Sequence, residues 1–205
     1  MAQKLFFRAA LAIVVAAAAQ RLSANPFALG TASFVSEQVW TVGGQTWSDV
    51  VQATGCGKTA YGSYEVQHGV YSADCRSNPA QKGSLFSWAA VVSFQDRLCP
   101  DGWRVPTTED FRALNTALGG QDVGIDNTYI DLAVLDKYLK LWGASYGGRC
   151  NSDGTLSYQG RGAIYWTKSD EKLGFGRGLY LFSDGGIYPQ LRRTKGYGFS
   201  LRCVK

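Results

Sequence analysis

The middle of the chain carries apolar residues at spacings of three and four, which is the pattern of helices that bury one face. Residues 84–98 follow this spacing and predict a helix, which Pro100 ends. Residues 132–142 repeat the spacing over a shorter length and predict another helix. The polar stretch 121–131 predicts a loop in front of it.

A further helix is predicted to begin after Pro106, at Thr107 or Thr108. With Thr107 as the N-cap, Asp110 occupies the third helical position, which is a variant of the capping box. The apolar residues of this segment fall on one stripe, and Gly119-Gly120 is typical of a helix end.

Short aromatic and β-branched runs predict strands in two parts of the chain. Near the start, Val39–Val50 predicts a strand pair that turns at Gly43-Gly44. Later runs, divided by glycines, predict strands at 163–168, 178–183, 187–192 and 198–204. Asp184–Gly186 predicts a hairpin turn between two of these strands. Two to three helices beside a twisted antiparallel sheet indicate the α+β class.

The first residues have the pattern of a secretory signal peptide, which we assign to residues 1–19. Lys4 and Arg8 precede an apolar run of about 11 residues that ends in small side chains. This run is too short to span a membrane, which takes ~20 residues. Cleavage is predicted before Gln20, with cleavage after Ala24 as the alternative. We therefore expect export, with no membrane-spanning helix after cleavage.

Composition indicates a folded single domain behind this leader. The chain has 205 residues, of which 45% are hydrophobic, and a net charge of +5, which excludes long disorder. Residues 20–37 predict a flexible lead-in and residues 38–205 one domain. Residues 53–83 are rich in glycine and polar side chains and predict a long loop. Residues 137–205 hold 12 Lys and Arg against 4 Asp and Glu, an imbalance that attracts anionic partners or is neutralised within the fold.

Five cysteines, an odd number, allow two disulfides with one free thiol, or one intermolecular bridge. They are Cys56, Cys75, Cys99, Cys150 and Cys203. Cys56 and Cys75 lie within the predicted loop and form one possible pair. The chain has no Cys-x-x-Cys motif and a single histidine, His68, which argues against a structural zinc site.

Candidate catalytic and metal-binding groups are sparse, and we predict no catalytic residue, cofactor or metal. A Cys–His or Ser–His pair would have to use His68, within the predicted loop. Helix capping accounts for Glu109 and Asp110. Four oxygen-bearing side chains gather in the loop before the third helix, but their spacing fits no established calcium loop. They are Asp122, Asp126, Asn127 and Asp131.

Aromatic and basic residues alternate around the predicted hairpin and form the candidate binding surface. Such side chains bind protein partners or glycans, because Tyr and Arg are favoured at interfaces. The alternative is an ordinary half-exposed sheet. The residues of this surface are Tyr180, Phe182, Tyr188, Arg177, Arg192 and Arg193, with Lys195 beside them.

Three motifs carry a family resemblance. CPDGWRVPTTEDF (99–111), GAIYWTKSDE (162–171) and GYGFSLRCVK (196–205) occur in this order, behind QVWTVGGQTW (38–47) and FSWAAV (86–91). Together they resemble the Fibrobacter succinogenes major paralogous domain, a family of exported proteins of Bacteroidetes and Fibrobacteres. The resemblance implies a C-type-lectin-like fold, related to sulfatase-modifying-factor domains, in which the first and last strands pair.

The same resemblance implies a disulfide between Cys99 and Cys203, which closes a loop of about 100 residues and stabilises the fold by ~4–5 kcal/mol in the chain-entropy model. Cys56–Cys75 is then the second pair and Cys150 the odd thiol, although Cys150 in place of either partner stays open. The tripeptides of calcium-dependent sugar binding, Glu-Pro-Asn, Gln-Pro-Asp and Trp-Asn-Asp, do not occur.

These observations predict an exported, non-enzymatic binding protein, periplasmic, outer-membrane-associated or at the cell surface. We expect an accessory or structural subunit that acts through protein–protein contacts, with a carbohydrate-binding surface protein as the alternative. Cleavage before Gln20 leaves a net charge of +3, which, with export, argues against nucleic acid as a partner.

Overall fold

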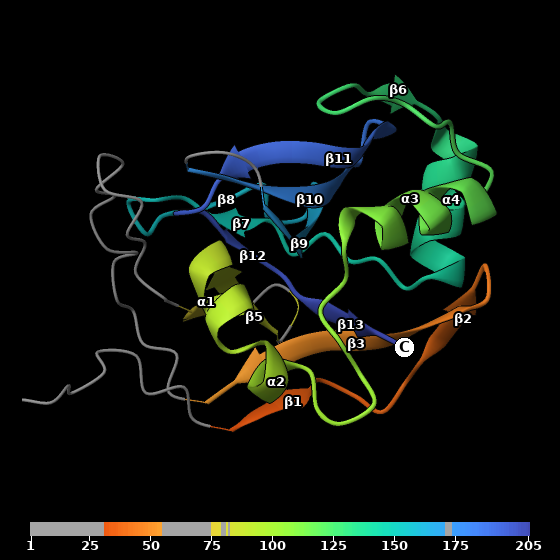
Figure 1. Ribbon diagram of the computed structural model, residues 1–205. Helices are drawn as coiled ribbons and strands as arrows, with labels where there is room; N and C mark the ends of the chain where they lie inside the picture. The colour runs from red at the N-terminus through yellow and green to blue at the C-terminus, as the bar shows by residue number, and fades with distance from the viewer. Residues whose placement is uncertain (1–30, 55–74, 79–80, 82, 171–173) are drawn as a thin grey trace, which may run out of the picture.

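The computed structural model describes residues 31–54, 75–78, 81, 83–170 and 174–205. Within them the chain has the predicted α+β class, with helices beside several antiparallel sheets (Figure 1). The helices are α1 (Trp88–Ser93), α2 (Gln95–Leu98), α3 (Thr108–Ala117) and α4 (Leu132–Leu141).

The strands fall into three sheets in the described part of the chain. In the first, β1 (Ala32–Phe34), β3 (Gln45–Ala53) and β13 (Arg202–Val204) pair in that order, with β2 (Trp40–Val42) on β3. In the second, the order is β6 (Tyr129–Ile130), β11 (Gly186–Thr194), β10 (Phe175–Phe182) and β9 (Gly162–Asp170). In the third it is β4 (Cys75–Ser77), β5 (Ser84–Ser87), β12 (Gly198–Phe199), β7 (Arg149–Cys150) and β8 (Leu156–Ser157).

The entry strand pairs with the end of the chain, as predicted. Val50 of β3 lies opposite Arg202 of β13, and Trp47 opposite Val204. The β2–β3 hairpin turns at Gly43-Gly44, where φ angles of +61° and +80° favour glycine. The prediction of a flexible lead-in is wrong for 32–34, because these residues form β1 and pair with the far end of β3.

The predicted helix over 107–118 is confirmed, and the one over 84–98 is only partly correct. Thr107 caps α3 and forms the capping box with Asp110. The segment 84–98 begins instead as strand β5, because Ser87 is an N-cap and starts the helix at Trp88. The helix then breaks at Phe94 into α1 and α2.

Two further segments differ from the sequence pattern. The predicted strand 198–204 divides into β12 and β13, and Ser200 between them hydrogen-bonds with β9 in the middle of the molecule. The predicted loop 121–131 ends in strand β6, which pairs with the start of β11. The strands β6, β12 and β13 are very short, and their formation depends on a partner that is distant in the sequence rather than on the local pattern.

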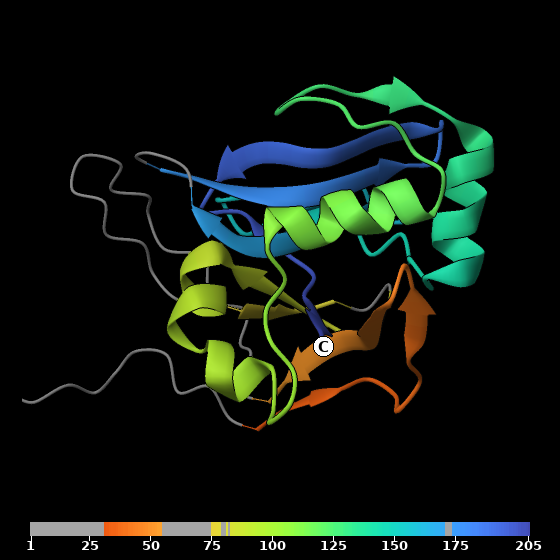
Figure 2. The same ribbon diagram turned by 45° about the vertical axis from the view of Figure 1, so that its right-hand side comes forward.

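The second sheet carries a hydrophobic cluster on each face. Helix α3 lies across one face of this sheet, and α4 stands at the end of the strands (Figure 2). Both helices share a hydrophobic cluster with alternate residues of that face, such as Tyr165, Leu179 and Leu181. The other face, with Trp166 and Tyr180, packs against α1 and β12. Burial of both faces is the reason that residues 163–166 of β9 and 179–182 of β10 form continuous apolar runs.

Candidate functional site

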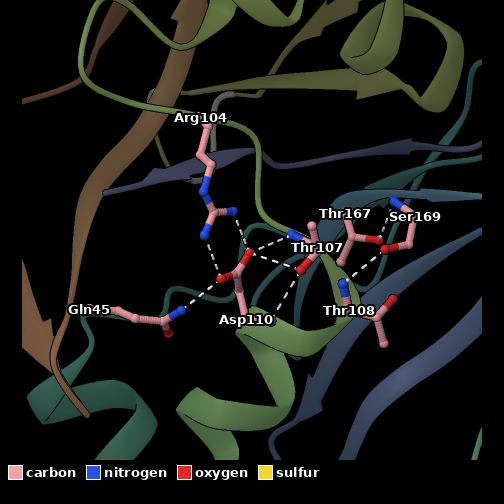
Figure 3. Close-up of polar contacts among 7 residues, drawn as sticks. All are labelled: Gln45, Arg104, Thr107, Thr108, Asp110, Thr167 and Ser169. Carbon is pink, nitrogen blue, oxygen red and sulfur yellow. Dashed lines mark hydrogen bonds and ion pairs between the residues drawn. The ribbon is translucent and has the colours of Figure 1, made fainter.

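Two of the motif segments, 38–47 and 99–111, meet around the carboxylate of Asp110, at the start of α3 (Figure 3). Arg104 donates two hydrogen bonds to it, from Nη1 at 2.6 Å and from Nη2 at 2.8 Å. The N–H and hydroxyl of Thr107 donate at 2.7 and 3.0 Å, and Nε2 of Gln45 donates at 2.6 Å from β3. Burial raises the pKa of Asp110, but hydrogen bonds from Arg104 and Thr107 outweigh it and leave the pKa below its ordinary value.

The strand motif of β9 joins the same network. The hydroxyl of Ser169 accepts a hydrogen bond from the N–H of Thr108 at 2.9 Å, and Thr167 in turn accepts the N–H of Ser169 at 3.2 Å (Figure 3). The side chains of this motif therefore hold β3, α3 and β9 together. With its oxygens engaged in these contacts, Asp110 acts in the fold as a helix cap, as the sequence pattern predicted.

The disulfide implied by the family resemblance is present. Cys99 and Cys203 are bridged, with their Cα atoms 5.7 Å apart, and the bridge ties the end of α2 to β13. Cys150 is buried in β7, and its thiol lies 3.5 Å from the carbonyl oxygen of Asn151. In the proposed pair Cys56–Cys75, Cys56 lies outside the described residues. His68 lies outside them too.

The acidic side chains of the loop before α4 turn to separate partners. Asp122 pairs with Arg112, Asp126 pairs with Arg192, and Asp131 caps α4 through the N–H of Val134. Among the residues that the structure describes, no three His, Cys, Asp or Glu side chains gather closely enough to hold a metal ion. The loop is thus tied to α3, β11 and α4 by its carboxylates.

The candidate binding surface divides between the two faces of the β10–β11 hairpin. Arg177 lies opposite Arg192, and Tyr180 lies opposite Tyr188. Because side chains alternate along a strand, the first pair shares a face with Leu179, whereas the second pair lies on the other face with Phe182 and Arg193. The prediction that Tyr180 belongs to an exposed surface is wrong, since its side chain is fully buried.

Part of the candidate surface lines a groove of about 550 Å³ along the edge of β11. Phe175, at the start of β10, is 42% exposed and forms one wall. The groove combines apolar side chains with two guanidinium groups and one carboxylate. Its lining residues are Asp126, Phe175, Tyr188, Leu191, Arg192 and Arg193.

Asp126 holds one of these arginines in place. Its Oδ1 accepts the backbone N–H of Arg192 at 2.8 Å, and its Oδ2 accepts Nε at 2.6 Å. Burial raises the pKa of Asp126, but these hydrogen bonds and the charges of Arg192 and Arg193 outweigh it and lower the pKa. Asp126 has a φ of +61°, a left-handed conformation that aspartate tolerates better than most residues.

Three of the groove residues, Asp126, Phe175 and Leu191, were not part of the predicted surface. Asp126 stands 66 residues before Arg192, so no local spacing relates the two. Leu191 stands two residues before Arg193 on β11, and side chains two apart on a strand lie on the same face. This alternation is a signal by which the sequence could have placed Leu191 beside Arg193. Phe175 borders residues 171–173, which lie outside the described part of the chain.

Comparison with protein families finds a match over residues 37–205, to the Fibrobacter succinogenes major domain. The chain belongs to this family. The match begins one residue before the predicted domain start and spans all five motif segments that carry the resemblance. No curated protein matches the chain, and no solved structure matches it either. Within the described residues, this Fibrobacter succinogenes major domain has no helix that is long and apolar enough to cross a membrane.

Proposed function

We propose that this Fibrobacter succinogenes major domain is an exported, non-enzymatic binding protein. It serves as an accessory or structural subunit at the bacterial cell envelope or surface, and it acts through protein–protein contacts. We further propose that its α+β fold is of the C-type-lectin-like kind. The pairing of β3 with β13, which brings the entry strand beside the end of the chain, supports that assignment.

Two features support export. Residues 1–19 have the basic, apolar and small-residue regions of a signal peptide. The Cys99–Cys203 disulfide is of the kind that forms and persists in oxidising compartments such as the periplasm or the cell exterior.

The groove along β11 is the observation that carries the binding proposal. It places the exposed ring of Phe175 and the half-buried ring of Tyr188 beside the guanidinium groups of Arg192 and Arg193. Aromatic and arginine side chains are enriched at protein interfaces, where they supply most of the binding energy. Because Asp126 already orders Arg192, a partner that binds here loses less conformational entropy on docking.

Carbohydrate binding is the second candidate, and a row of aromatic rings favours it. The ring centroid of Phe182 lies 5.4 Å from that of Tyr158 and 5.9 Å from that of Tyr188. Rings that are partly exposed in such a row are suited to stacking against sugars. Protein binding remains the first candidate because arginines, rather than amides or free carboxylates, accompany the groove.

Purification of the tagged protein from its native envelope in mild detergent tests the proposal. The groove variant combines Arg193→Gln with Phe175→Ser, which removes one cation and one exposed ring from the groove. The matched control combines Arg112→Gln with Leu141→Ser, which removes a cation and an exposed apolar side chain elsewhere.

We expect a stoichiometric protein partner with the wild-type chain and the control, and its loss with the groove variant. Equal recovery with both variants would place the interface elsewhere and refute the groove as the binding surface. If the protein is recovered as a monomer without a partner and binds members of a glycan panel, the carbohydrate-binding alternative is established.

A further inference from the structure

Two contacts fix the guanidinium group of Arg193, which lines the groove along β11. Its Nη1 donates a hydrogen bond to the carbonyl oxygen of Arg192 at 2.7 Å. Its guanidinium carbon lies 5.3 Å from the centroid of the Tyr180 ring, within the range of attraction between a cation and an aromatic face. A side chain held in this way loses less conformational entropy when it binds a further group.

One edge of this guanidinium group is free. Its two nitrogens, Nε and Nη2, have no hydrogen-bond partner among the residues that the structure describes, and no ion pair there includes Arg193. The side chain is half-buried, but neither nitrogen is among the buried polar atoms that lack a partner, so both are open to solvent. Their N–H groups are parallel donors, which match the two oxygens of a carboxylate.

Arg192, the preceding residue, has the same edge occupied. Its Nε and its Nη2 each lie 2.6 Å from Oδ2 of Asp126. The other oxygen of this carboxylate, Oδ1, accepts the backbone N–H of Arg192. Among the described residues that line the groove, Asp126 is the one carboxylate, so Arg193 has no counter-charge within it. The groove therefore favours an anion supplied by a partner.

Apolar side chains lie in the same groove. The ring of Phe175 is 42% exposed, the ring of Tyr188 is half-buried, and Leu191 lies beneath them at 3% exposure. Removal of exposed apolar surface from water favours association. The groove is therefore suited to a ligand that carries an apolar group beside its negative charge.

The lining is less suited to sugar hydroxyl groups, each of which is a hydrogen-bond donor as well as an acceptor. Both oxygens of Asp126 are already engaged with Arg192. None of the described lining residues carries an amide. The groove thus lacks acceptors for hydroxyl groups, which favours a peptide over a neutral glycan.

We infer that the groove along β11 binds an aspartate or glutamate side chain of the protein partner, together with an apolar residue next to it. The carboxylate pairs with Nε and Nη2 of Arg193, the same two nitrogens through which Arg192 pairs with Asp126. The apolar neighbour covers the exposed ring of Phe175. The inference rests on the proposed function, because it names the chemistry by which the groove recognises that partner.

Short peptides test the groove without the natural partner. The full chain is titrated with acetyl-Leu-Glu-Phe-amide, with its glutamine counterpart and with acetyl-Ser-Glu-Ser-amide, and binding is followed by NMR chemical shifts. We expect saturable binding of the glutamate peptide and about tenfold weaker binding of the glutamine peptide, which is the effect of one hydrogen-bonded charge. The serine peptide should also bind more weakly, because it lacks the apolar side chains. Equal affinity for the glutamate and glutamine peptides, or no binding of either, would refute the inference.

Arg193→Gln identifies the cation that the carboxylate contacts. It removes the charge and the free pair of donors but keeps a polar side chain on β11. We expect it to weaken the glutamate peptide about tenfold and to leave the glutamine peptide unchanged, because the lost contact needs both charged groups. Arg112→Gln, which removes a cation that does not line the groove, should leave both affinities unchanged. An equal loss for both peptides in Arg193→Gln, or no loss for either, would contradict the assignment.

Two further variants separate the geometry of the cation from the apolar contact. Arg193→Lys keeps the charge without the planar pair of donors, so its affinity for the glutamate peptide should fall between those of wild type and Arg193→Gln. Phe175→Ser should weaken the glutamate and glutamine peptides by the same factor, because it removes apolar contact alone. Leu141→Ser, which removes an exposed apolar side chain elsewhere, should weaken neither. Unchanged affinity in Phe175→Ser would reject the apolar neighbour.

Sulfate and glucuronate, titrated at the same ionic strength, distinguish other sources of negative charge. We expect both to bind more weakly than the glutamate peptide, because neither carries an apolar side chain. Sulfate binding as tight as that of the peptide would overturn the carboxylate assignment, and tighter glucuronate binding would assign the groove to an acidic glycan.

The inference and the proposed function fail in different ways. Loss of the envelope partner in the groove variant, with no binding of the glutamate peptide, would retain protein binding through the groove and reject the carboxylate. Selective binding of the glutamate peptide by a chain that recovers no envelope partner would retain the carboxylate site and reject the role as a subunit.

Discussion

Arg202 lies over the indole ring of Trp142, with its guanidinium carbon 4.3 Å from the ring centroid, and donates a hydrogen bond to the carbonyl oxygen of that tryptophan. The ring of Trp40 borders the same guanidinium at 4.2 Å, and the carbonyl oxygen of Ser48 accepts Nε at 2.6 Å. The side chain is fully buried, and burial lowers the pKa of Arg202 to about 10. At neutral pH a charged arginine therefore joins β13 to β2, β3 and the end of α4.

Substitution of Arg202 should separate the cost of its charge from the value of its contacts. We expect Arg202→Lys to lose about 3–4 kcal/mol of unfolding free energy, because an ammonium group stays buried and cannot reproduce the planar donors. Arg202→Met keeps the volume without a charge and should lose less. Urea unfolding measures both, and a methionine variant less stable than the lysine variant would contradict this account.

Asp110 should make stability depend on acid. Its pKa is lower in the fold than the ordinary value of about 3.9, so it stabilises above that pH, and the contribution is lost as pH falls through the folded pKa. We expect Asp110→Asn to be about 1–2 kcal/mol less stable at pH 7, since Arg104 is half exposed and solvent screens part of the pair. The unfolding free energies of wild type and Asp110→Asn should converge as the pH falls from 7 to 2. A difference between them that stays constant over this range would contradict the linkage.

Removal of the Cys99–Cys203 bridge should be costly. In the chain-entropy model a loop closed across 104 residues stabilises by about 4–5 kcal/mol. We expect the double variant Cys99→Ala/Cys203→Ala to unfold at correspondingly lower urea concentration, and the wild type to do the same under reductant. Peptide mapping of the unreduced protein should recover both cysteines in one linked pair; two free thiols there would disprove the bridge.

Asp126→Asn should isolate the charge that orders Arg192. Asparagine tolerates the left-handed backbone, so the loop keeps its conformation. The side chains of this ion pair are one-third to one-half exposed, so solvent screens it and we expect a stability loss of about 1 kcal/mol. Recovery of the envelope partner should nevertheless fall several-fold, because Arg192 is then no longer held in place. Unchanged recovery would mean that Asp126 serves only the fold.

Helix α3 shows where sequence reasoning succeeds. Its cap, its capping-box partner and its closing glycine lie within the helix or beside it, so each signal acts on the residues that carry it. The hairpin turn at Gly185, with a φ of +95°, was predicted for the same reason. Local chemistry is sufficient when the deciding interaction spans only a few residues.

Segment 84–98 shows where it fails. The apolar spacing extends across β5 and α1, but Ser87 and pairing of Phe86 with Phe199, far along the chain, make the first four residues a strand. The position of Tyr180 beside the hairpin likewise does not predict its burial, because β12 covers that face of the sheet and lies far along the chain. Both errors arise from contacts across long stretches of sequence.

By itself, the sequence determined the α+β class and the general region of the candidate surface. Through the family resemblance it also determined the pairing of the entry strand with the end of the chain and the Cys99–Cys203 bridge. Only the tertiary structure decided which residues of that surface share a face, that Asp126 orders Arg192, and that the ring of Tyr180 is buried beside the guanidinium group of Arg193. Helix caps, turns and strand alternation act through neighbours in the chain. The groove depends instead on segments that meet only when the sheets pack.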